Sequence, residues 1–352
     1  MMIFSKKAFS RMAGVLAVLC ACLAPGWAHA GYANAAYILK VATLVPRGMG
    51  WSNQMEKIVI PKIYETTGGN LYLKIYWGGI AGDSEQMLRK VRAGELDGVG
   101  LDGQAALLAA TEFGVLELPF LFRDYGEVDY IREKMFPVFA EHLKKNGYMF
   151  FMWADQDFDQ IYSVKPELAD PARLARAAFI NWGGLLEKKV ITSIGAKAIP
   201  TTVTGLRQSL IAGKADTVIA PALWMLGIQA HSVVRYVSPL KIRYSPGVLL
   251  ARRDSLEKLP EEYKKKTQTL RGEITRRFNQ AVREDNQKAI KAMLEYGILL
   301  VSMTPENEAA IQRATRPVWN SMAGILYPRE LLDAILGHLE RYRAQKGAGD
   351  KR

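Results

Sequence analysis

Apolar and polar residues alternate in a strand-then-helix rhythm along the first hundred residues that follow the leader. Residues 37–44, 71–77 and 97–101 have the short, β-rich pattern of strands. Residues 51–69 and 84–94 have helical spacing, and each ends in glycine. Alternation of this kind is typical of a parallel sheet with helices on both faces, an α/β fold.

In open sheets of this type, ligands bind beyond the carboxyl ends of the strands. Here those ends are followed by segments 46–51, 77–79 and 102–104. We therefore predict binding residues among Trp51, Trp77, Gly79 and Asp102.

The second half repeats the rhythm, with strand candidates at residues 160–164, 177–181, 216–221 and 233–242. A helical tract from 260 to about 297 follows, allowing for a break, and is long enough to brace two lobes. Residues 86–99 (QMLRKVRAGELDGV) and 207–218 (RQSLIAGKADTV) both combine a helix, the pattern AGxxD and a β-rich run. This short echo favours two lobes built on one plan.

The first 30 residues have the pattern of a secretory signal: three early cations, an apolar segment and the triplet Ala28-His29-Ala30. We expect cleavage after Ala30 and a protein in the periplasm. Both cysteines, Cys20 and Cys22, lie inside this segment, so no disulfide is expected. A cut before Cys22 with lipid attachment is the alternative.

The formal net charge of +12 raises the question of nucleic acid. The cations are interleaved with acids along helical segments such as 261–285, and no aromatic-basic motif accompanies them. They indicate solvated helix faces, and we expect no nucleic-acid partner.

Catalytic and metal-binding motifs are missing. His142, His231 and His338 each stand alone, and there is no phosphate loop, nucleophile elbow or dinucleotide fingerprint. We expect no catalytic residue, metal or cofactor. Alternatives stay open for the aspartates of ADQDFDQ, Asp155, Asp157 and Asp159: they form a polar loop, bind a cation through alternate positions, or act as the acid and base of a hydrolase or lyase.

The stretch AFINWGGLLE (178–187) has two interpretations. An apolar run breaks into Asn181, Trp182 and two glycines directly before a helix. Glycine permits close backbone approach, and the indole and amide supply a flat apolar face and a hydrogen bonder, as in the lip of a binding site. A strand-to-helix turn with a half-buried core Trp explains the same residues.

Several ordered segments resemble the extracytoplasmic solute receptors of tripartite ATP-independent periplasmic (TRAP) transporters, the DctP-like solute-binding protein family 7. The segments are TTGGNLYLKIYWGGIAGDSEQMLRKVRAGELDGVG, VLELPFLFRDYGE, SVKPELADPARL, GAKAIPTTVTGLRQSLIAGKADTVIAP and KLPEEYKKK. The resemblance covers almost the whole chain after the leader.

The resemblance implies a two-lobed periplasmic-binding-protein fold of type II-like character, with strands crossing between the lobes and a long helix spanning both. We expect lobe I at 31–157 with 246–285 returning to it, lobe II at 158–245 with 286–330 packing on it, and a C-terminal helix and tail at 331–352. It also implies a monomeric receptor that closes over a small molecule and presents it to small and large membrane subunits, with uptake driven by an ion gradient. A lipid chaperone or sensory receptor on the same scaffold is an alternative.

Three positions depart from the family pattern. An arginine that binds a substrate carboxylate in typical members matches Ile180, a second arginine matches Asp159, and an asparagine before a proline matches Ala220. Without these groups a buried carboxylate costs several kcal/mol, unless another cation such as Arg47 or Arg123 substitutes. The replacements favour an apolar, aromatic or lipid-like ligand. The candidate ligand-binding residues are Trp51, Trp77, Gly79, Asp102, Trp153, Asp155, Asp159, Phe179, Ile180, Asn181, Trp182, Ala220 and Trp224.

Overall fold

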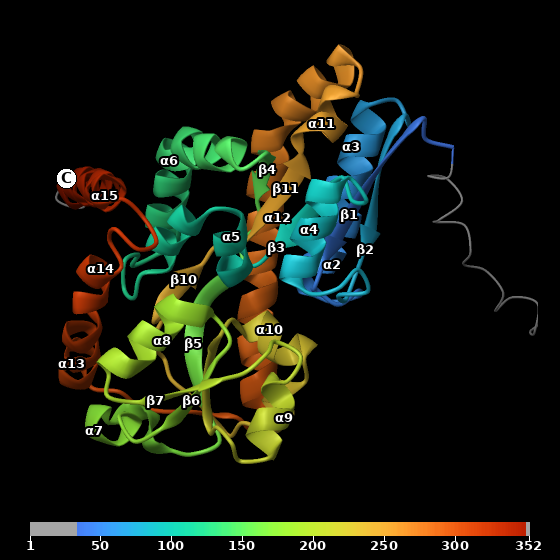
Figure 1. Cartoon of the computed structure of the whole chain (residues 1–352). Coiled ribbons are helices and arrows are strands. Elements are labelled where there is room, and N and C mark those ends of the chain that lie inside the picture. Colours follow the sequence, from blue (N-terminus) through green and yellow to red (C-terminus); the bar gives the residue numbers. More distant parts are fainter. Residues whose placement is uncertain (1–33, 350–352) are drawn as a thin grey trace, which may run out of the picture.

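The computed structural model describes residues 34–349, which form two α/β lobes, one above the other in Figure 1. The predicted leader, its cleavage site and both cysteines lie outside the described residues. Within residues 34–349, no helix is both long and apolar enough to cross a membrane.

Lobe I is built on a five-stranded sheet of order β2-β1-β3-β11-β4. Strand β1 runs parallel to β2 and β3, while β11 is antiparallel to β3 and β4. The three strands predicted in the first hundred residues are confirmed. The bounds are β1 Tyr37–Thr43, β2 Leu71–Tyr76, β3 Gly98–Leu101, β4 Tyr148–Trp153 and β11 Val248–Arg252.

The two predicted helices of this region are also present. The first is interrupted by one π-helical turn at Met55–Val59, between α2 (Gly50–Gln54) and α3 (Ile60–Thr66). The second, α4 (Ser84–Ala93), begins at an Asp83 capping box and ends at Gly94, whose φ of 80° suits glycine. Two further helices of lobe I are α5 Gly103–Ala109 and α6 Tyr125–Lys145.

Lobe II contains a sheet of order β12-β9-β5-β8-β6-β7, and β10 pairs with β5 at its side. Strand β6 is parallel to β7 and β8, and β5 is antiparallel to β8. The bounds are β5 Asp157–Ser163, β6 Ala178–Asn181, β7 Lys197–Pro200, β8 Thr217–Ala220, β9 Tyr236–Val237, β10 Arg243–Ser245 and β12 Leu299–Leu300.

The prediction of one strand over residues 233–242 is largely wrong. Only the two residues of β9 pair within it, and the next strand, β10, starts after it. Pro239 lies two residues after β9, and proline cannot donate a ladder hydrogen bond. The pairing with β5 is interrupted there and resumes at Ile242, whose N–H donates to the Asp159 carbonyl at 3.0 Å.

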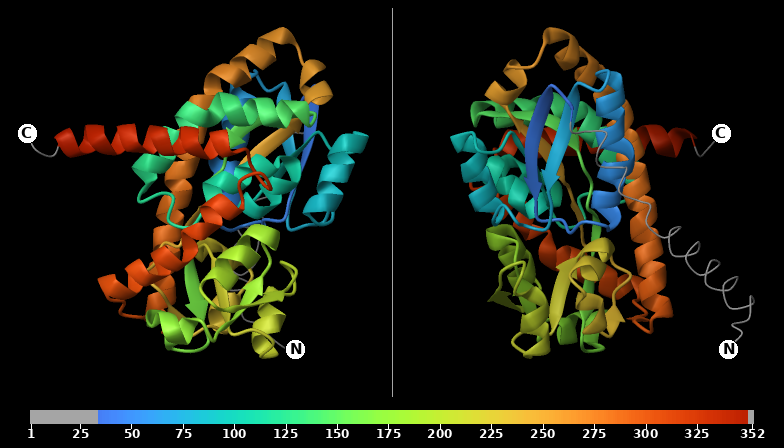
Figure 2. Two further views of the ribbon diagram at one scale, coloured as in Figure 1. Left: turned by 60° about the vertical axis from the view of Figure 1, so that its left-hand side comes forward. Right: turned by 90° about the vertical axis from the view of Figure 1, so that its right-hand side faces the viewer.

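A 35-residue helix, α12 (Glu261–Glu295), runs along both lobes (Figures 1 and 2). It packs on α2, α3 and β4 of lobe I and on α10 and β5 of lobe II. The break allowed for in the prediction is absent. The other helices are α7 Pro171–Leu174, α8 Gly184–Ser193, α9 Leu206–Ile211, α10 Ala222–Gly227, α11 Arg253–Glu257, α13 Pro305–Thr315, α14 Pro317–Ser321 and α15 Arg329–Gly349.

Helix α15 lies across α6 of lobe I, at the end of the chain (Figure 2). Arg343 of α15 donates to both oxygens of the Glu127 carboxylate, at 2.7 and 2.8 Å, and this carboxylate is buried at the start of α6. The C-terminal helix is thus fixed to lobe I by a bidentate ion pair.

Candidate ligand-binding site

The two lobes meet where the carboxyl ends of β1 and β3 in lobe I face those of β6 and β8 in lobe II. A Cβ atom at Gly183 would lie 2.5 Å from the Gln104 side chain, and one at Gly50 would lie 2.7 Å from Leu223. A larger residue at either position would require the Gln104 or Leu223 side chain to move, and at Gly50, with a φ of 37°, it would also strain the backbone. A cavity of about 30 Å³ remains at the interface, lined by residues that include Val45, Trp51 and Trp224.

Lobe II contributes an apolar wall. Ile180 on β6 is fully buried in a cluster with Tyr162, Ala220 and Trp224. The Trp182 ring is stacked parallel to the Trp224 ring, with 6.0 Å between centroids and an interplanar angle of 6°. The Trp182 indole also donates from Nε1 to the Ile219 carbonyl at 3.1 Å. Four predicted site residues are therefore brought together here.

Lobe I contributes a second set of aromatic side chains, centred on Trp51. The Trp51 ring contacts Trp77 and Phe278 edge to face, at 6.3 and 5.4 Å between centroids. Trp51 is buried and donates from Nε1 to the Ala154 carbonyl at 3.3 Å. Gly79 follows in the turn after β2, where its N–H donates to the Thr43 carbonyl at 3.0 Å.

A buried polar cluster lies beside the apolar wall, centred on Arg243 of β10. Its guanidinium donates from Nε to Asp159 at 2.7 Å and from Nη2 to Glu187 at 3.0 Å, and Nη1 lies 3.9 Å from Glu117. The Gln104 amide donates a hydrogen bond to the Glu117 carboxylate, and both residues belong to lobe I. Arg243, Glu117, Asp159 and Glu187 are each at most 1% exposed. We name these five residues the Arg243 cluster.

Burial governs the electrostatics of the Arg243 cluster. Desolvation raises the pKa of Glu117, Asp159 and Glu187, and Arg243 opposes this rise in each case. Burial disfavours the Arg243 cation, but the surrounding carboxylates more than offset it and raise its pKa. Three carboxylates thus share one arginine, which leaves no surplus positive charge.

Part of this cluster has no hydrogen-bond partner among residues 34–349. The unpartnered atoms are Gln104 Oε1, Glu117 Oε1, Asp159 Oδ1 and Arg243 Nη1. Three of the four are acceptors. All four atoms are shielded from solvent, so a ligand would reach them only if the lobes moved apart.

The loop between β6 and α8 is held by the same cluster. Glu187 accepts hydrogen bonds from the backbone N–H groups of Trp182 and Gly183, both at 2.7 Å. The Asn181 amide, oriented by its hydrogen bonds, donates to Glu187 at 3.2 Å. The break in AFINWGGLLE therefore places Trp182 against the apolar wall and its backbone on a buried carboxylate.

The aspartates of ADQDFDQ have three separate sets of partners. Asp155 accepts from Arg132, from Arg283 Nη2 at 2.7 Å and from Tyr244 at 2.5 Å. Burial acts to raise the pKa of Asp155, but Arg132 and Arg283 lower it overall.

Asp157 accepts from Tyr125, and burial raises the pKa of Asp157 to about 6. Asp159 belongs to the Arg243 cluster. The three side chains are fixed by different partners and do not form a joint acid-base pair.

Of the other predicted residues, Trp153 and Phe179 lie in the core, whereas Asp102 follows β3 at the interface, near enough to Arg243 for their charges to interact. Trp153 packs in the lobe I core, with Phe150 at 4.6 Å and Phe139 at 5.6 Å between ring centroids. Phe179 is fully buried in the same continuous core. Asp102 caps α5 by accepting from the Ala105 N–H at 2.9 Å, and burial raises its pKa.

Sequence reasoning missed Arg243, Glu187 and Glu117, and it included Gln104 only as part of the segment 102–104. Two of them carried a usable signal: Arg243 stands between Ile242 and Tyr244, and Glu117 stands between Leu116 and Leu118. A charged residue inside an apolar run requires a buried partner. Within the part of the chain that the structure describes, no group of three or more His, Cys, Asp or Glu side chains is placed to hold a metal ion.

Comparison with known proteins places these features in context. The family model "Bacterial extracellular solute-binding protein, family 7" (DctP) matches residues 54–324. The 2,3-diketo-L-gulonate-binding periplasmic protein YiaO of Escherichia coli K12 is 21% identical over 242 residues, which cover 68% of this chain and 74% of YiaO.

Solved structures share the fold. A TRAP periplasmic solute-binding protein from Desulfovibrio salexigens, with bound orotic acid, superposes with a TM-score of 0.81 at 18% identity, covering 87% of this chain and 99% of that one. The sugar acid binding protein DctPAm from Advenella mimigardefordensis, in complex with galactonate, gives a TM-score of 0.80 at 18% identity, covering 86% and 98%.

Proposed function

Because the chain belongs to family 7 of the bacterial extracellular solute-binding proteins, we propose that it captures a small ligand with a mainly apolar or aromatic body between its lobes. The coarser function follows from the family: the protein is an extracytoplasmic solute receptor of the TRAP type and not an enzyme. The hydrolase interpretation of Asp155, Asp157 and Asp159 is therefore not favoured.

The observation that carries the ligand proposal is the environment of Ile180. This side chain matches the position of a carboxylate-binding arginine in typical members, and it is fully buried beside Ala220 and Trp224. Removing about 200 Å² of apolar ligand surface from water contributes about 5 kcal/mol before the costs of association. Of this apolar group, the half-buried Trp182 is the side chain that a ligand can reach most readily.

Arg243 is the one cation of the cluster, and its position argues against an organic acid. Its Nε and Nη2 are already bonded to Asp159 and Glu187. A ligand carboxylate would approach a group that contains three buried carboxylates, and an uncompensated buried charge costs several kcal/mol. Orotic acid and galactonate, the ligands named for two similar structures, are nevertheless the competing class.

We further propose that the receptor closes by a hinge and delivers its ligand to the small and large membrane subunits of a TRAP transporter. A ligand that touches both lobes stabilises the closed form because it makes its full contacts only there. The close approaches of Gly183 to Gln104 and of Gly50 to Leu223 support closure of this kind.

The test is a calorimetric titration of the protein, freed of bound ligand, with two solute sets at low and high salt. One set contains neutral aromatic and aliphatic solutes, and the other contains C4-dicarboxylates and sugar acids. The proposal expects tight binding only in the first set, with weak salt dependence, because salt screens exposed ion pairs. Tight binding of a sugar acid or dicarboxylate with steep salt dependence would overturn the ligand class and leave the receptor assignment intact.

A further inference from the structure

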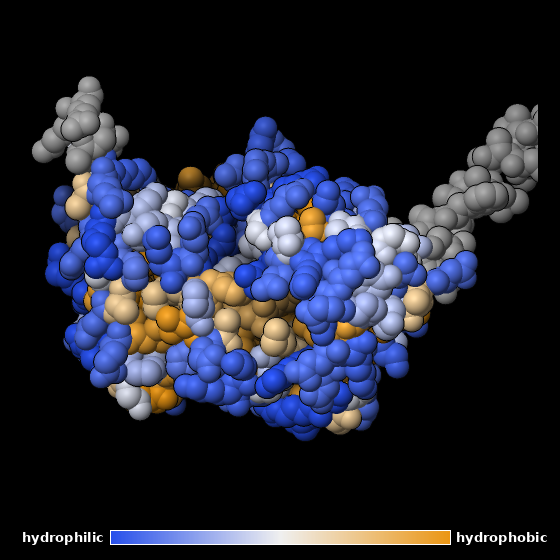
Figure 3. Space-filling view, turned by 90° about the horizontal axis from the view of Figure 1, so that it is seen from above, coloured by the Kyte–Doolittle hydropathy of each residue, from blue (hydrophilic) through white to orange (hydrophobic). Residues whose placement is uncertain are grey.

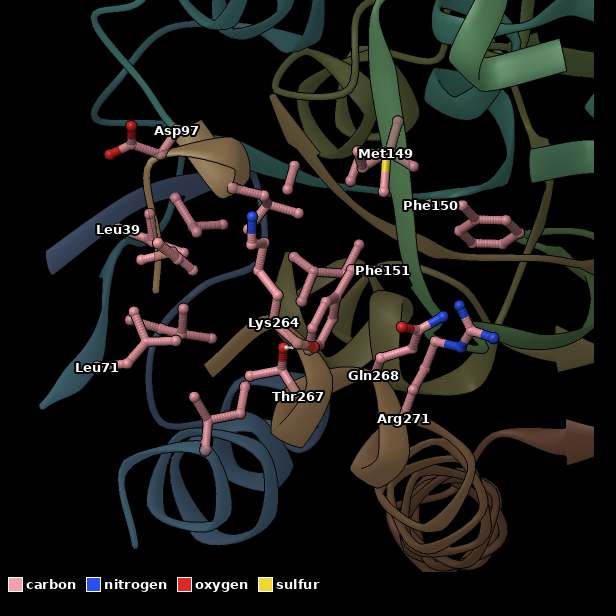
Figure 4. Close-up of a pocket in the computed structure, with 18 of the residues that line it drawn as sticks. Leu39, Leu71, Asp97, Met149, Phe150, Phe151, Lys264, Thr267, Gln268 and Arg271 are labelled. Carbon is pink, nitrogen blue, oxygen red and sulfur yellow. Dashed lines mark hydrogen bonds between the residues drawn. The ribbon is translucent and has the colours of Figure 1, made fainter. Parts of the chain in front are cut away.

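A second cavity lies in lobe I, away from the interface between the lobes. It has a volume of about 270 Å³ and lies between the lobe I sheet and the first turns of α12 (Figure 4). Its sheet residues include Leu39 near the start of β1 and Leu71 at the start of β2. The ligand cleft adjoins the opposite, carboxyl ends of these strands. We call this space the lobe I cavity.

The interior of the lobe I cavity is apolar. Leu71, Leu73 and Leu249 form part of its wall, and each is at most 6% exposed. Phe151 is half-buried against the same space, and Met149, at 40% exposed, lies where the cavity opens. An aliphatic cavity of about 150 Å³ stays dry and binds benzene, so a space of this size suits a larger apolar group.

Two polar groups of the cavity wall are already satisfied by the protein. The Asp97 carboxylate accepts from the Lys40 N–H at 2.8 Å and from the Ser255 hydroxyl at 2.7 Å. The Thr267 hydroxyl donates to the Tyr263 carbonyl of its own helix at 2.9 Å. Because these groups already have hydrogen-bond partners in the protein, they have little capacity to bind a sugar or another polar solute. The interior therefore favours a hydrocarbon chain.

Polar side chains of α12 lie along one side of the cavity. Lys264, Gln268 and Arg271 are spaced four and three residues apart, on one face of α12. In Figure 4 the Lys264 side chain reaches from the helix toward the middle of the cavity. Its ammonium pairs with Glu261 at 2.8 Å.

The positive charge of Arg271, unlike that of Lys264, has no acidic partner among the described residues. Its guanidinium lies 4.1 Å from the centre of the Phe136 ring, and no carboxylate within residues 34–349 forms a salt bridge with it. Burial lowers the pKa of Arg271, as expected for a cation partly removed from water. Among the residues that line the cavity, Lys264 and Arg271 are cations and Asp97 and Glu261 are acids, so the charges balance.

We propose that the lobe I cavity is a second binding site, which takes the hydrocarbon chain of a single-chain anionic amphiphile such as a fatty acid and holds its carboxylate at Lys264. The apolar interior accepts the chain, and the Lys264 ammonium, which reaches into the cavity, pairs with the anionic head. Seen from above, the molecule shows a band of apolar residues between hydrophilic margins (Figure 3). The site is independent of the ligand proposed for the cleft.

The test is calorimetric titration of the delipidated protein with octanoate, decanoate, dodecanoate and dodecylamine, below their micelle concentrations. We expect one saturable site, with affinity rising about fourfold for each added methylene until the cavity is full. Dodecanoate should bind at least tenfold more tightly than dodecylamine. Lys264→Glu should remove this preference, and Lys265→Glu, the same charge change on the exposed neighbouring residue, should keep it.

Three results would overturn the proposal. The first is equal affinity for octanoate and dodecanoate, and the second is an equal loss of binding in Lys264→Glu and Lys265→Glu. The third is loss of dodecanoate binding in Trp182→Ala with full binding in Lys264→Glu, since the chain would then occupy the cleft. That third outcome would support the apolar cleft proposed above, so failure of one site is distinguishable from failure of the other.

Discussion

Arg243 and Asp159 face each other on the adjacent strands β10 and β5, with Arg243 Nε 2.7 Å from Asp159 Oδ2 and both side chains shielded from solvent. From the resemblance to the family, we expect Asp159 to stand where typical members have an arginine. In this chain Arg243 of the neighbouring strand donates to Asp159, and its charge is balanced by the protein's own carboxylates. We therefore propose that the interface between the lobes is polar without favouring an anion.

Removal of this guanidinium should be costly. Arg243→Met leaves Glu117, Asp159 and Glu187 buried without their cation, and breaking a buried pair typically costs about 3–5 kcal/mol. Urea unfolding at neutral pH should show this loss. Arg277→Met, on the exposed face of α12, is the matched control and should change stability by less than about 1 kcal/mol. A loss for Arg243→Met no larger than that of the control would show that the cluster is not held together by Arg243.

Asp157 should make stability fall as pH rises. Burial raises its pKa from 3.8 to about 6, so between about pH 4 and 6 the native state binds a proton that the unfolded chain releases. Between pH 5 and 7.5 this group should remove roughly 1 kcal/mol of unfolding free energy. Asp157→Asn should flatten the slope by that amount, and Asp254→Asn on the surface should not. Equal slopes in the wild type and Asp157→Asn would refute the assignment.

Ile180→Arg tests whether the family's arginine can be restored. Because Ile180 is fully buried in an apolar cluster, the new charge has no partner, and we expect a stability loss of several kcal/mol and weaker binding of the native ligand. Ile180→Met keeps the volume and should cost less than about 1.5 kcal/mol. If Ile180→Arg were as stable as Ile180→Met and bound succinate tightly, this position would belong to a carboxylate site.

Trp182→Ala tests the aromatic wall. The half-buried indole stacks on Trp224, and its loss should weaken ligand binding by about 1–3 kcal/mol with little change in melting temperature. Tyr296→Ala removes an aromatic ring that is 63% exposed and should leave affinity unchanged. A stability loss of roughly 3–5 kcal/mol with intact affinity would instead identify Trp182 as a core residue.

Local patterns were sufficient for much of the fold. The strands at 37–43 and 71–76 and the helix at 84–93 have clear hydrophobic periods with caps or glycines at their ends, and these are properties of neighbouring residues. The segment 233–242 was wrongly predicted as one strand because its β-rich composition is continuous, whereas its pairing with β5 is interrupted around Pro239.

The polar half of the site could not be predicted in the same way. Arg243 and Asp159 are 84 residues apart in the sequence, and only the pairing of β10 with β5 brings them together. No local pattern encodes that register, and Glu187 and Glu117 join the cluster from two further elements. The apolar part of the site was easier to predict, because Ile180 and Trp182 stand in a single short segment.

The identity of the natural ligand tests the central claim most directly. The protein should be purified from its native host under non-denaturing conditions, and its bound molecule identified by native mass spectrometry followed by extraction. The account predicts one small molecule per chain with a mainly apolar or aromatic body, whose occupancy falls in Trp182→Ala and persists in high salt. A sugar acid or dicarboxylate at one per chain, released by salt, would contradict it.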